Sequence, residues 1–187
     1  MSVPPFPCIE TARCVLTLLR PENAQLLAAY KEKNQAHLAP WEPARDPQHA
    51  NLVQTCEHAA QRSWQAFLEG SALQFIALDR TSQRMVAGCN FTNIVLGPLQ
   101  ACFLGYSVDQ DFQGRGMMRE VAQAGIRHMF DSVGLHRIMA NHMPGNVRSE
   151  KMLRALGFER EGYARSYLKI ADRWEDMVLN ALVNVGT

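Results

Sequence analysis

The sequence lacks paired cysteines, metal-ligand spacings and any apolar run long enough to cross a bilayer. Its five cysteines are odd in number and include no Cys-x-x-Cys pair, which argues against a disulfide framework or a zinc site and indicates a reducing compartment. The six histidines show no ligand spacing either, so we expect no metal. Residues 1–10 lack the charged-then-apolar pattern of a signal peptide, and we therefore expect a soluble, cytoplasmic protein without a membrane partner.

An excess of charge of one sign is also missing, because the formal net charge is +1. A protein that relies on bulk electrostatics to bind nucleic acid needs a strongly basic face, so we expect no sequence-specific nucleic-acid partner. Nine Lys or Arg between Arg115 and Arg165 leave two interpretations open, a local basic patch or a solvated helix face.

The residues that are present describe an ordinary globular chain of 187 residues, 47% hydrophobic and 20% charged. This length fits one domain with a sizeable core. No repeat or long linker divides the sequence. We predict an N-terminal extension at 1–10 and a single domain at 11–187.

Hydrophobic periodicity predicts strands first, and then strands that alternate with helices. Leu26, Leu27 and Tyr30 form a helical stripe, and further helices are expected at 49–69, at 117–132 and after Asn146. Strands are expected at 15–20, 73–78, 85–95, 101–108, 136–143, 159–167 and 174–183. This order predicts an α/β or α+β fold with a mixed sheet and helices on both faces.

A glycine-containing turn, Gln113-Gly-Arg-Gly116, separates an alternating run at 103–108 from the helix that begins near Met117. Glycine lets the backbone curl tightly and direct several N–H groups to one point, where the helix adds its positive N-terminal end. This arrangement suits a pyrophosphate. A tight strand-to-helix turn needs glycine whether or not it binds a ligand, so the turn indicates a phosphate site only in combination with a second motif.

About thirty residues later come Asn146-x-x-Ser149 and a helix that closes in Gly157-Phe158. This order resembles the GCN5-related N-acetyltransferases (GNAT). Four further segments are similar to the RimJ-type branch, which acetylates N-terminal alanines of ribosomal proteins, and the resemblance covers about 11–183. These segments are LAPWEP at 38–43, ACFLGYS at 101–107, MANHMPGN at 139–146 and EGYA at 161–164.

The resemblance implies a GNAT fold with a mostly antiparallel, seven-stranded sheet and a splayed parallel strand pair. It implies acetyl-CoA as cosubstrate, whose pantetheine arm would pair with 104–108 where this strand splays from 138–142. The pyrophosphate would bind amides at 113–118, although Met118 stands where the family signature has a small residue. The implied cofactor-binding residues are Leu104, Tyr106, Ser107, Val108, Gln113, Gly114, Arg115, Gly116, Met117, Met118, Asn146 and Ser149.

Acetyl transfer requires a neutral amine, stabilisation of an oxyanion and help for the leaving thiolate. By resemblance, backbone N–H groups near Tyr106 would stabilise the oxyanion. Many relatives place a catalytic Tyr seven residues after the Asn, but this chain has Leu153 there. Ser149 is the remaining candidate to hydrogen-bond the sulfur, with the alternative that it is only small enough to admit it. Asn146 has the additional interpretation of a helix N-cap.

A lysine amine is neutral in about 0.04% of molecules at pH 7, whereas an α-amino group is neutral in roughly 14%, so an N-terminal acceptor needs less help from a base. Glu42 would orient the amine or accept its proton through water, and Trp41 would form a wall for the peptide. The alternative is that Trp41 packs and Glu42 is solvated. The resemblance adds Asn141 as a substrate-binding residue.

The implied partner is the N-terminal alanine of a small-subunit ribosomal protein, free or in a pre-ribosomal particle. Two alternatives stay open. One is an acetyltransferase for a small amine such as a polyamine or an antibiotic, and the other is a non-catalytic ribosome assembly factor.

Overall fold

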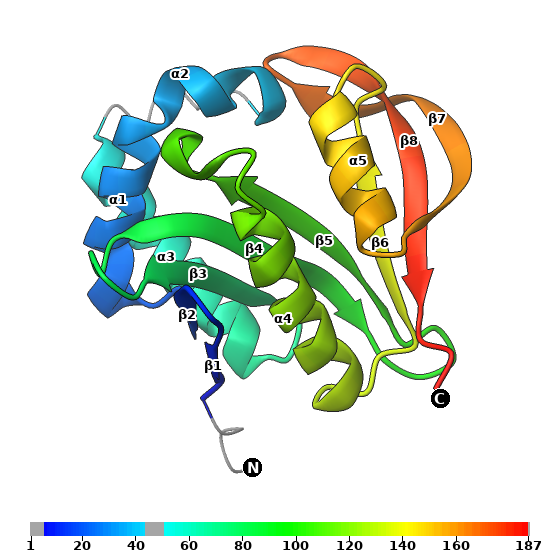
Figure 1. Cartoon of the computed structure of the whole chain (residues 1–187), viewed down its shortest axis with the longest axis horizontal. Helices are drawn as coiled ribbons and strands as arrows, with labels where there is room; N and C mark the ends of the chain where they lie inside the picture. The colour runs from blue at the N-terminus through cyan, green and yellow to red at the C-terminus, as the bar shows by residue number, and fades with distance from the viewer. Residues whose placement is uncertain (1–5, 44–50, 187) are drawn as a thin grey trace.

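The computed structural model describes residues 6–43 and 51–186, which form an eight-stranded sheet with helices packed on both faces (Figure 1). The strands lie in the order β1-β2-β3-β4-β5-β6-β8-β7. Their bounds are β1 (Cys8–Glu10), β2 (Cys14–Leu18), β3 (Leu73–Asp79), β4 (Met85–Val95), β5 (Ala101–Val108), β6 (Arg137–His142), β7 (Glu159–Ile170) and β8 (Arg173–Val183).

Every neighbouring pair in the sheet is antiparallel except β5 and β6, which confirms the predicted mixed, mostly antiparallel sheet. The predicted count of seven strands was wrong by one. The additional strand is β1, which pairs with β2 and places Ile9 opposite Leu16. Three residues are too few to show a period-two pattern, so the sequence did not indicate this strand, and it lies inside the segment predicted as an extension.

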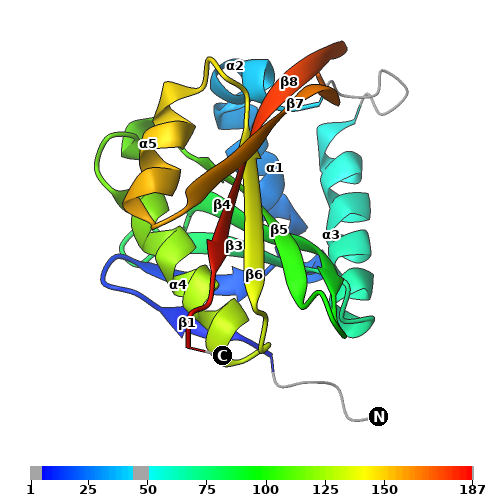
Figure 2. The same ribbon diagram turned by 90° about the vertical axis from the view of Figure 1, so that its right-hand side faces the viewer.

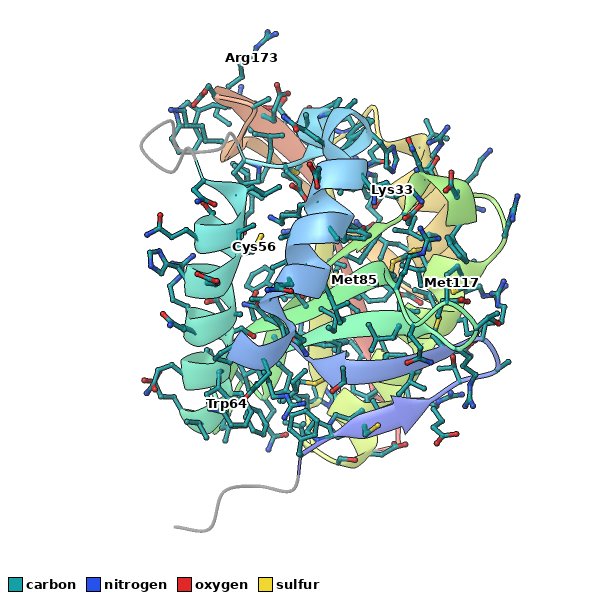
Figure 3. All side chains as sticks on the ribbon, turned by 90° about the vertical axis from the view of Figure 1, so that its left-hand side faces the viewer. Lys33, Cys56, Trp64, Met85, Met117 and Arg173 are labelled. Carbon is teal, nitrogen blue, oxygen red and sulfur yellow. The ribbon has the colours of Figure 1, made fainter. Side chains whose placement is uncertain are left out.

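The helices lie in two layers, with α1 and α3 on one face of the sheet and α4 and α5 on the other (Figure 2). In the first layer, Cys56 of α3 is buried on the side of this helix that faces α1 (Figure 3). The helix predicted at 49–69 begins at Leu52, where the Asn51 side chain accepts a hydrogen bond from Gln54 N–H, and 49–50 lie outside the described residues. The bounds are α1 (Ala24–Lys33), α2 (Gln35–Leu38), α3 (Leu52–Leu68), α4 (Met117–Asp131) and α5 (Val147–Ala155), with short 3-10 turns η1 (Pro21–Asn23), η2 (Ala39–Trp41) and η3 (Gln110–Phe112).

The core lies mainly between α4 and the sheet. Val121, Ala122 and Met129 of α4 are fully buried there with Phe75 and Phe91 of the sheet. The two phenylalanine rings meet edge to face with centroids 6.3 Å apart, a preferred arrangement of aromatic pairs. Within 6–43 and 51–186, no helix is long and apolar enough to cross a membrane.

The parallel pair β5–β6 opens partway along its length. The two strands pair from Ala101 to Phe103 on β5 and from Arg137 to Met139 on β6, and no later pair joins them in the described chain. Beyond that point the strands diverge (Figure 1). The splay predicted for 104–108 is confirmed, but on β6 it begins at Ala140 and not at Ile138, because Ile138 still pairs with Cys102.

Candidate functional site

The free edge of β5 faces the opening between the splayed strands. Asp109 N–H donates to the Val86 carbonyl at 2.8 Å, and the β4–β5 register runs without a shift from Phe103 to Val108. Hydrogen-bonded pairs alternate along an antiparallel ladder, so Leu104, Tyr106 and Val108 direct their N–H and C=O groups away from β4. These groups form a row of main-chain donors and acceptors at the opening, where an extended amide chain can pair with them.

The turn at 113–116 joins this strand end to the start of α4. Gly114 and Gly116 have φ of +69° and +71°, in the left-handed region that glycine adopts without strain, and Gly116 is the N-cap of α4. On the outer side, the Arg115 carbonyl accepts a hydrogen bond from Arg13 Nη1 at 2.8 Å, and Arg13 pairs with Glu120 at 2.7 Å. The turn is therefore held from outside, and its glycines line a cavity on the inner side.

The start of α5 forms the facing wall. Asn146 caps the helix, since its Oδ1 accepts a hydrogen bond from Ser149 N–H at 3.1 Å. Ser149 is 9% exposed, and its Oγ lies 2.5 Å from the hydroxyl of Tyr106 on β5. Burial raises the pKa of Tyr106 to about 12, against the opposing effect of this hydrogen bond. The phenol therefore keeps its proton at neutral pH.

A cavity of about 800 Å³ lies between the η2 segment, the end of β5, the glycine turn and α5. A cavity of this volume is large enough for a cofactor. Most of the residues predicted for the site line it. They are Trp41, Glu42, Tyr106, Ser107, Val108, Gln113, Gly114, Gly116, Met117, Met118, Asn146 and Ser149.

Three predicted residues do not line the cavity. The Leu104 side chain is buried in the core, which leaves only its backbone at the opening. Arg115 is exposed and lines neither of the two cavities. Asn141 lines neither of the two cavities, and it lies on the face of β6 opposite to buried Ala140. Asn141 as a substrate-binding residue therefore stays a prediction without support from its position.

Other lining residues were not predicted. Arg148 donates to Gln113 Oε1 at 2.7 Å, and the Gln113 amide nitrogen lies 2.7 Å from Nε2 of His37. The His37–Gln113 contact spans 76 positions, so no local pattern could indicate it. Arg148 and Lys151 could have been predicted from the sequence. They are three residues apart near the start of a helix, and residues at this spacing share one face of the helix. The remaining residues missed are Leu38, Phe112, Arg119, Gly145, Val147 and Met152.

Helix α1 holds the end of β5 in place. Lys33 bonds both carboxylate oxygens of Asp109, at 2.9 and 2.8 Å, and Figure 3 shows Lys33 on the side of α1 toward this segment. Tyr30 donates its hydroxyl hydrogen bond to Ser107 Oγ at 2.9 Å. Burial would raise the pKa of Asp109, but the Lys33 hydrogen bond and the Asp111 N–H outweigh it and hold that pKa below its usual value. Asp109 thus stays ionised and paired at neutral pH.

A second cavity of about 360 Å³ adjoins the first, and Leu38 and Glu42 line both. Its far wall is the turn between β7 and β8, at Ala171 and Asp172. Ala171 N–H donates to the Glu42 carbonyl at 3.2 Å, which ties this turn to the η2 segment. Glu42 therefore lies between the two cavities, of which the larger one contains the β5 opening.

Residues 13–159 match the family model described as the acetyltransferase (GNAT) domain, which covers more than half of the chain. The chain belongs to the GNAT acetyltransferase family. The opened β5 edge and the glycine turn thus lie in a GNAT domain, and the family expected from the sequence is confirmed.

Among its curated relatives is the [ribosomal protein uS5]-alanine N-acetyltransferase of Escherichia coli K12. This GNAT chain is 42% identical to it over 182 residues, which cover 93% of the chain and 89% of the relative. The Vibrio fischeri ribosomal-protein-S5-alanine acetyltransferase has a TM-score of 0.89 at 33% identity, over 96% of this chain and 97% of that one. Mycobacterium smegmatis RimJ in complex with CoA-disulfide has a TM-score of 0.76 at 25% identity, over 95% and 87%. These relatives confirm the similarity to the ribosomal-protein-alanine branch.

Proposed function

We propose that this protein transfers the acetyl group of acetyl-CoA to the N-terminal amine of a ribosomal protein. The proposed acceptor residue is the N-terminal alanine of a small-subunit protein. The observation that carries acetyl transfer is the opened edge of β5, which meets the glycine turn in one cavity of about 800 Å³. The acceptor rests on the 42% identity to an enzyme named for the uS5 alanine. The proposed catalytic domain is 11–187, and the proposed location is the cytoplasm.

The cavity suits the two ends of acetyl-CoA. The main-chain groups of Leu104 and Val108, together with the Tyr106 carbonyl, can pair with the amides of a pantetheine arm, as a neighbouring strand would. The amides at 113–118 and the N-terminal end of α4 can hold the pyrophosphate, since both present partial positive charge. Arg119, Arg148 and Lys151 line the same cavity and add full positive charges for the phosphates.

Each step of the transfer has a residue within the cavity. As the amine nitrogen bonds the carbonyl carbon, the Tyr106 N–H donates to the developing oxyanion. When the C–S bond breaks, the electron pair goes to sulfur, and the Ser149 hydroxyl donates a hydrogen bond to it. The proton lost by the amine passes through water to the Glu42 carboxylate, and the thiolate takes its proton from water.

The second cavity offers a path for the acceptor. It meets the first cavity at Leu38 and Glu42, so an N-terminal residue can reach the reacting centre while the following residues lie toward Ala171 and Asp172. An α-amino group needs little activation, because roughly 14% is already neutral at pH 7. The acceptor would be a ribosomal protein, either free or in a pre-ribosomal particle.

The test is an acetylation assay with the purified protein, acetyl-CoA and a peptide that begins with alanine and contains lysine. We expect release of CoA and a mass increase confined to the N-terminus. The same peptide with its N-terminus blocked is expected to give no turnover. Faster turnover with a polyamine or an antibiotic would favour the small-amine alternative, and no turnover with any amine would favour the non-catalytic assembly role.

Glu42→Gln is expected to lower kcat/KM at pH 7 by about tenfold, because the amide cannot accept the amine proton. The loss should shrink toward pH 9, where the α-amino group is mostly neutral without a base. A pH-rate profile measures both effects. Glu32→Gln is the matched control, since Glu32 is exposed on α1 and lines neither cavity. An unchanged profile for Glu42→Gln would remove Glu42 from the chemistry.

A further inference from the structure

Two hydroxyl groups from opposite walls meet inside the large cavity. The Tyr106 hydroxyl lies 2.5 Å from Ser149 Oγ, a contact between β5 and α5 across 43 positions of sequence. The Asn146 side chain holds the Ser149 backbone at 3.1 Å, so the main chain and the side chain of Ser149 are both fixed. Both members of this hydroxyl pair line the cavity.

The hydroxyl pair has two protons, and its own hydrogen bond uses only one of them. Each hydroxyl carries one O–H donor, and only one proton can lie between the two oxygens. When Tyr106 donates to Ser149, the Ser149 proton is free to point elsewhere. Burial raises the pKa of Tyr106 to about 12, so the phenol keeps its proton at neutral pH and is able to donate it to Ser149 Oγ.

The position of Leu153 shows why this pair matters. Leu153 is one helical turn after Ser149 on the same face of α5, where many relatives have a tyrosine, and it is 1% exposed in the core. A leucine offers no proton to a leaving thiolate. In this chain the tyrosine hydroxyl reaches the same turn of α5 from β5 instead.

We propose that Tyr106 is the positioning residue for Ser149: it donates to Ser149 Oγ and so directs the serine proton to the sulfur of the leaving thiolate. This inference rests on the proposed acetyl transfer. At the step in question the C–S bond breaks, sulfur receives the electron pair, and the two hydroxyls only donate hydrogen bonds. No covalent bond to Tyr106 or Ser149 forms, and water supplies the proton that neutralises the thiolate.

The test is a double-mutant cycle on kcat with Tyr106→Phe, Ser149→Ala and the combined variant. Because Tyr106 acts through Ser149, Tyr106→Phe alone should lower kcat about tenfold, and the combined variant should match Ser149→Ala within about twofold. The KM for acetyl-CoA should not change. If the combined loss equals the product of the two single losses, Tyr106 acts independently of Ser149 and the inference is overturned.

Tyr30→Phe is the matched control. Tyr30 is 4% exposed and also donates to a serine of β5, Ser107, so its loss disturbs the same strand without touching Ser149. Its effect should multiply with that of Ser149→Ala. Calorimetric titration with CoA is the control for folding, because a variant that still binds CoA retains its fold. The cycle can use any amine that the wild type acetylates, so a wrong acceptor leaves it valid, whereas no turnover with any amine overturns both proposals.

Discussion

Gly114→Asp is expected to weaken CoA binding by about a hundredfold. The new carboxylate would lie in the turn that lines the cavity, beside the proposed pyrophosphate. Two like charges about 5 Å apart repel by roughly 3 kcal/mol at an effective dielectric constant near 20, and each 1.4 kcal/mol is about tenfold in affinity. Isothermal titration with CoA at low and high salt measures the loss, which should shrink as salt screens the repulsion.

Two variants separate charge from backbone strain. Gly114→Asn has nearly the same shape as Gly114→Asp without its charge, so it should bind CoA at least tenfold more tightly than the aspartate variant. Gly97→Asp adds the same residue at φ +74° in the β4–β5 turn, where no atom lies within 4 Å of the new Cβ, and Gly97 lines neither of the two cavities. Its affinity for CoA should stay within about twofold of wild type. An equal Kd for Gly114→Asp and wild type would place the pyrophosphate away from this turn.

The sequence predicts the parts of this site that depend on neighbouring residues. The glycine turn and the Asn146 cap could be predicted because left-handed glycines and helix caps are local requirements of the backbone. The strand β1 escaped prediction because three residues show no periodicity. The start of the splay on β6 was predicted too early, at Ile138. The last pair joins Phe103 to Met139, and the point at which pairing ends is set by tertiary packing and not by either strand alone.

The side-chain contacts across the cavity also depend on tertiary packing, so they cannot be predicted from a single sequence. Tyr106 was expected to contribute its backbone, and nothing in its local pattern indicates that its hydroxyl meets α5. The alternation of β5 explains how one residue serves two purposes. At Tyr106 the N–H faces the opening in the plane of the sheet, while the side chain stands perpendicular to the sheet toward α5. The next residue, Ser107, points to the other face and contacts Tyr30 of α1.

Ser149→Ala is expected to lower kcat by about a hundredfold, the lower end of what a positioned proton donor contributes. The KM for acetyl-CoA and the Kd for CoA should stay within about twofold, because the hydroxyl is used at the sulfur only as the C–S bond breaks. Steady-state rates with the alanine-starting peptide measure this separation. Ser132→Ala is the control, since Ser132 is exposed at the end of α4. If Ser149 served only to leave room for the sulfur, alanine would serve as well, so an unchanged kcat would contradict its role as a donor and would leave the leaving thiolate to water alone.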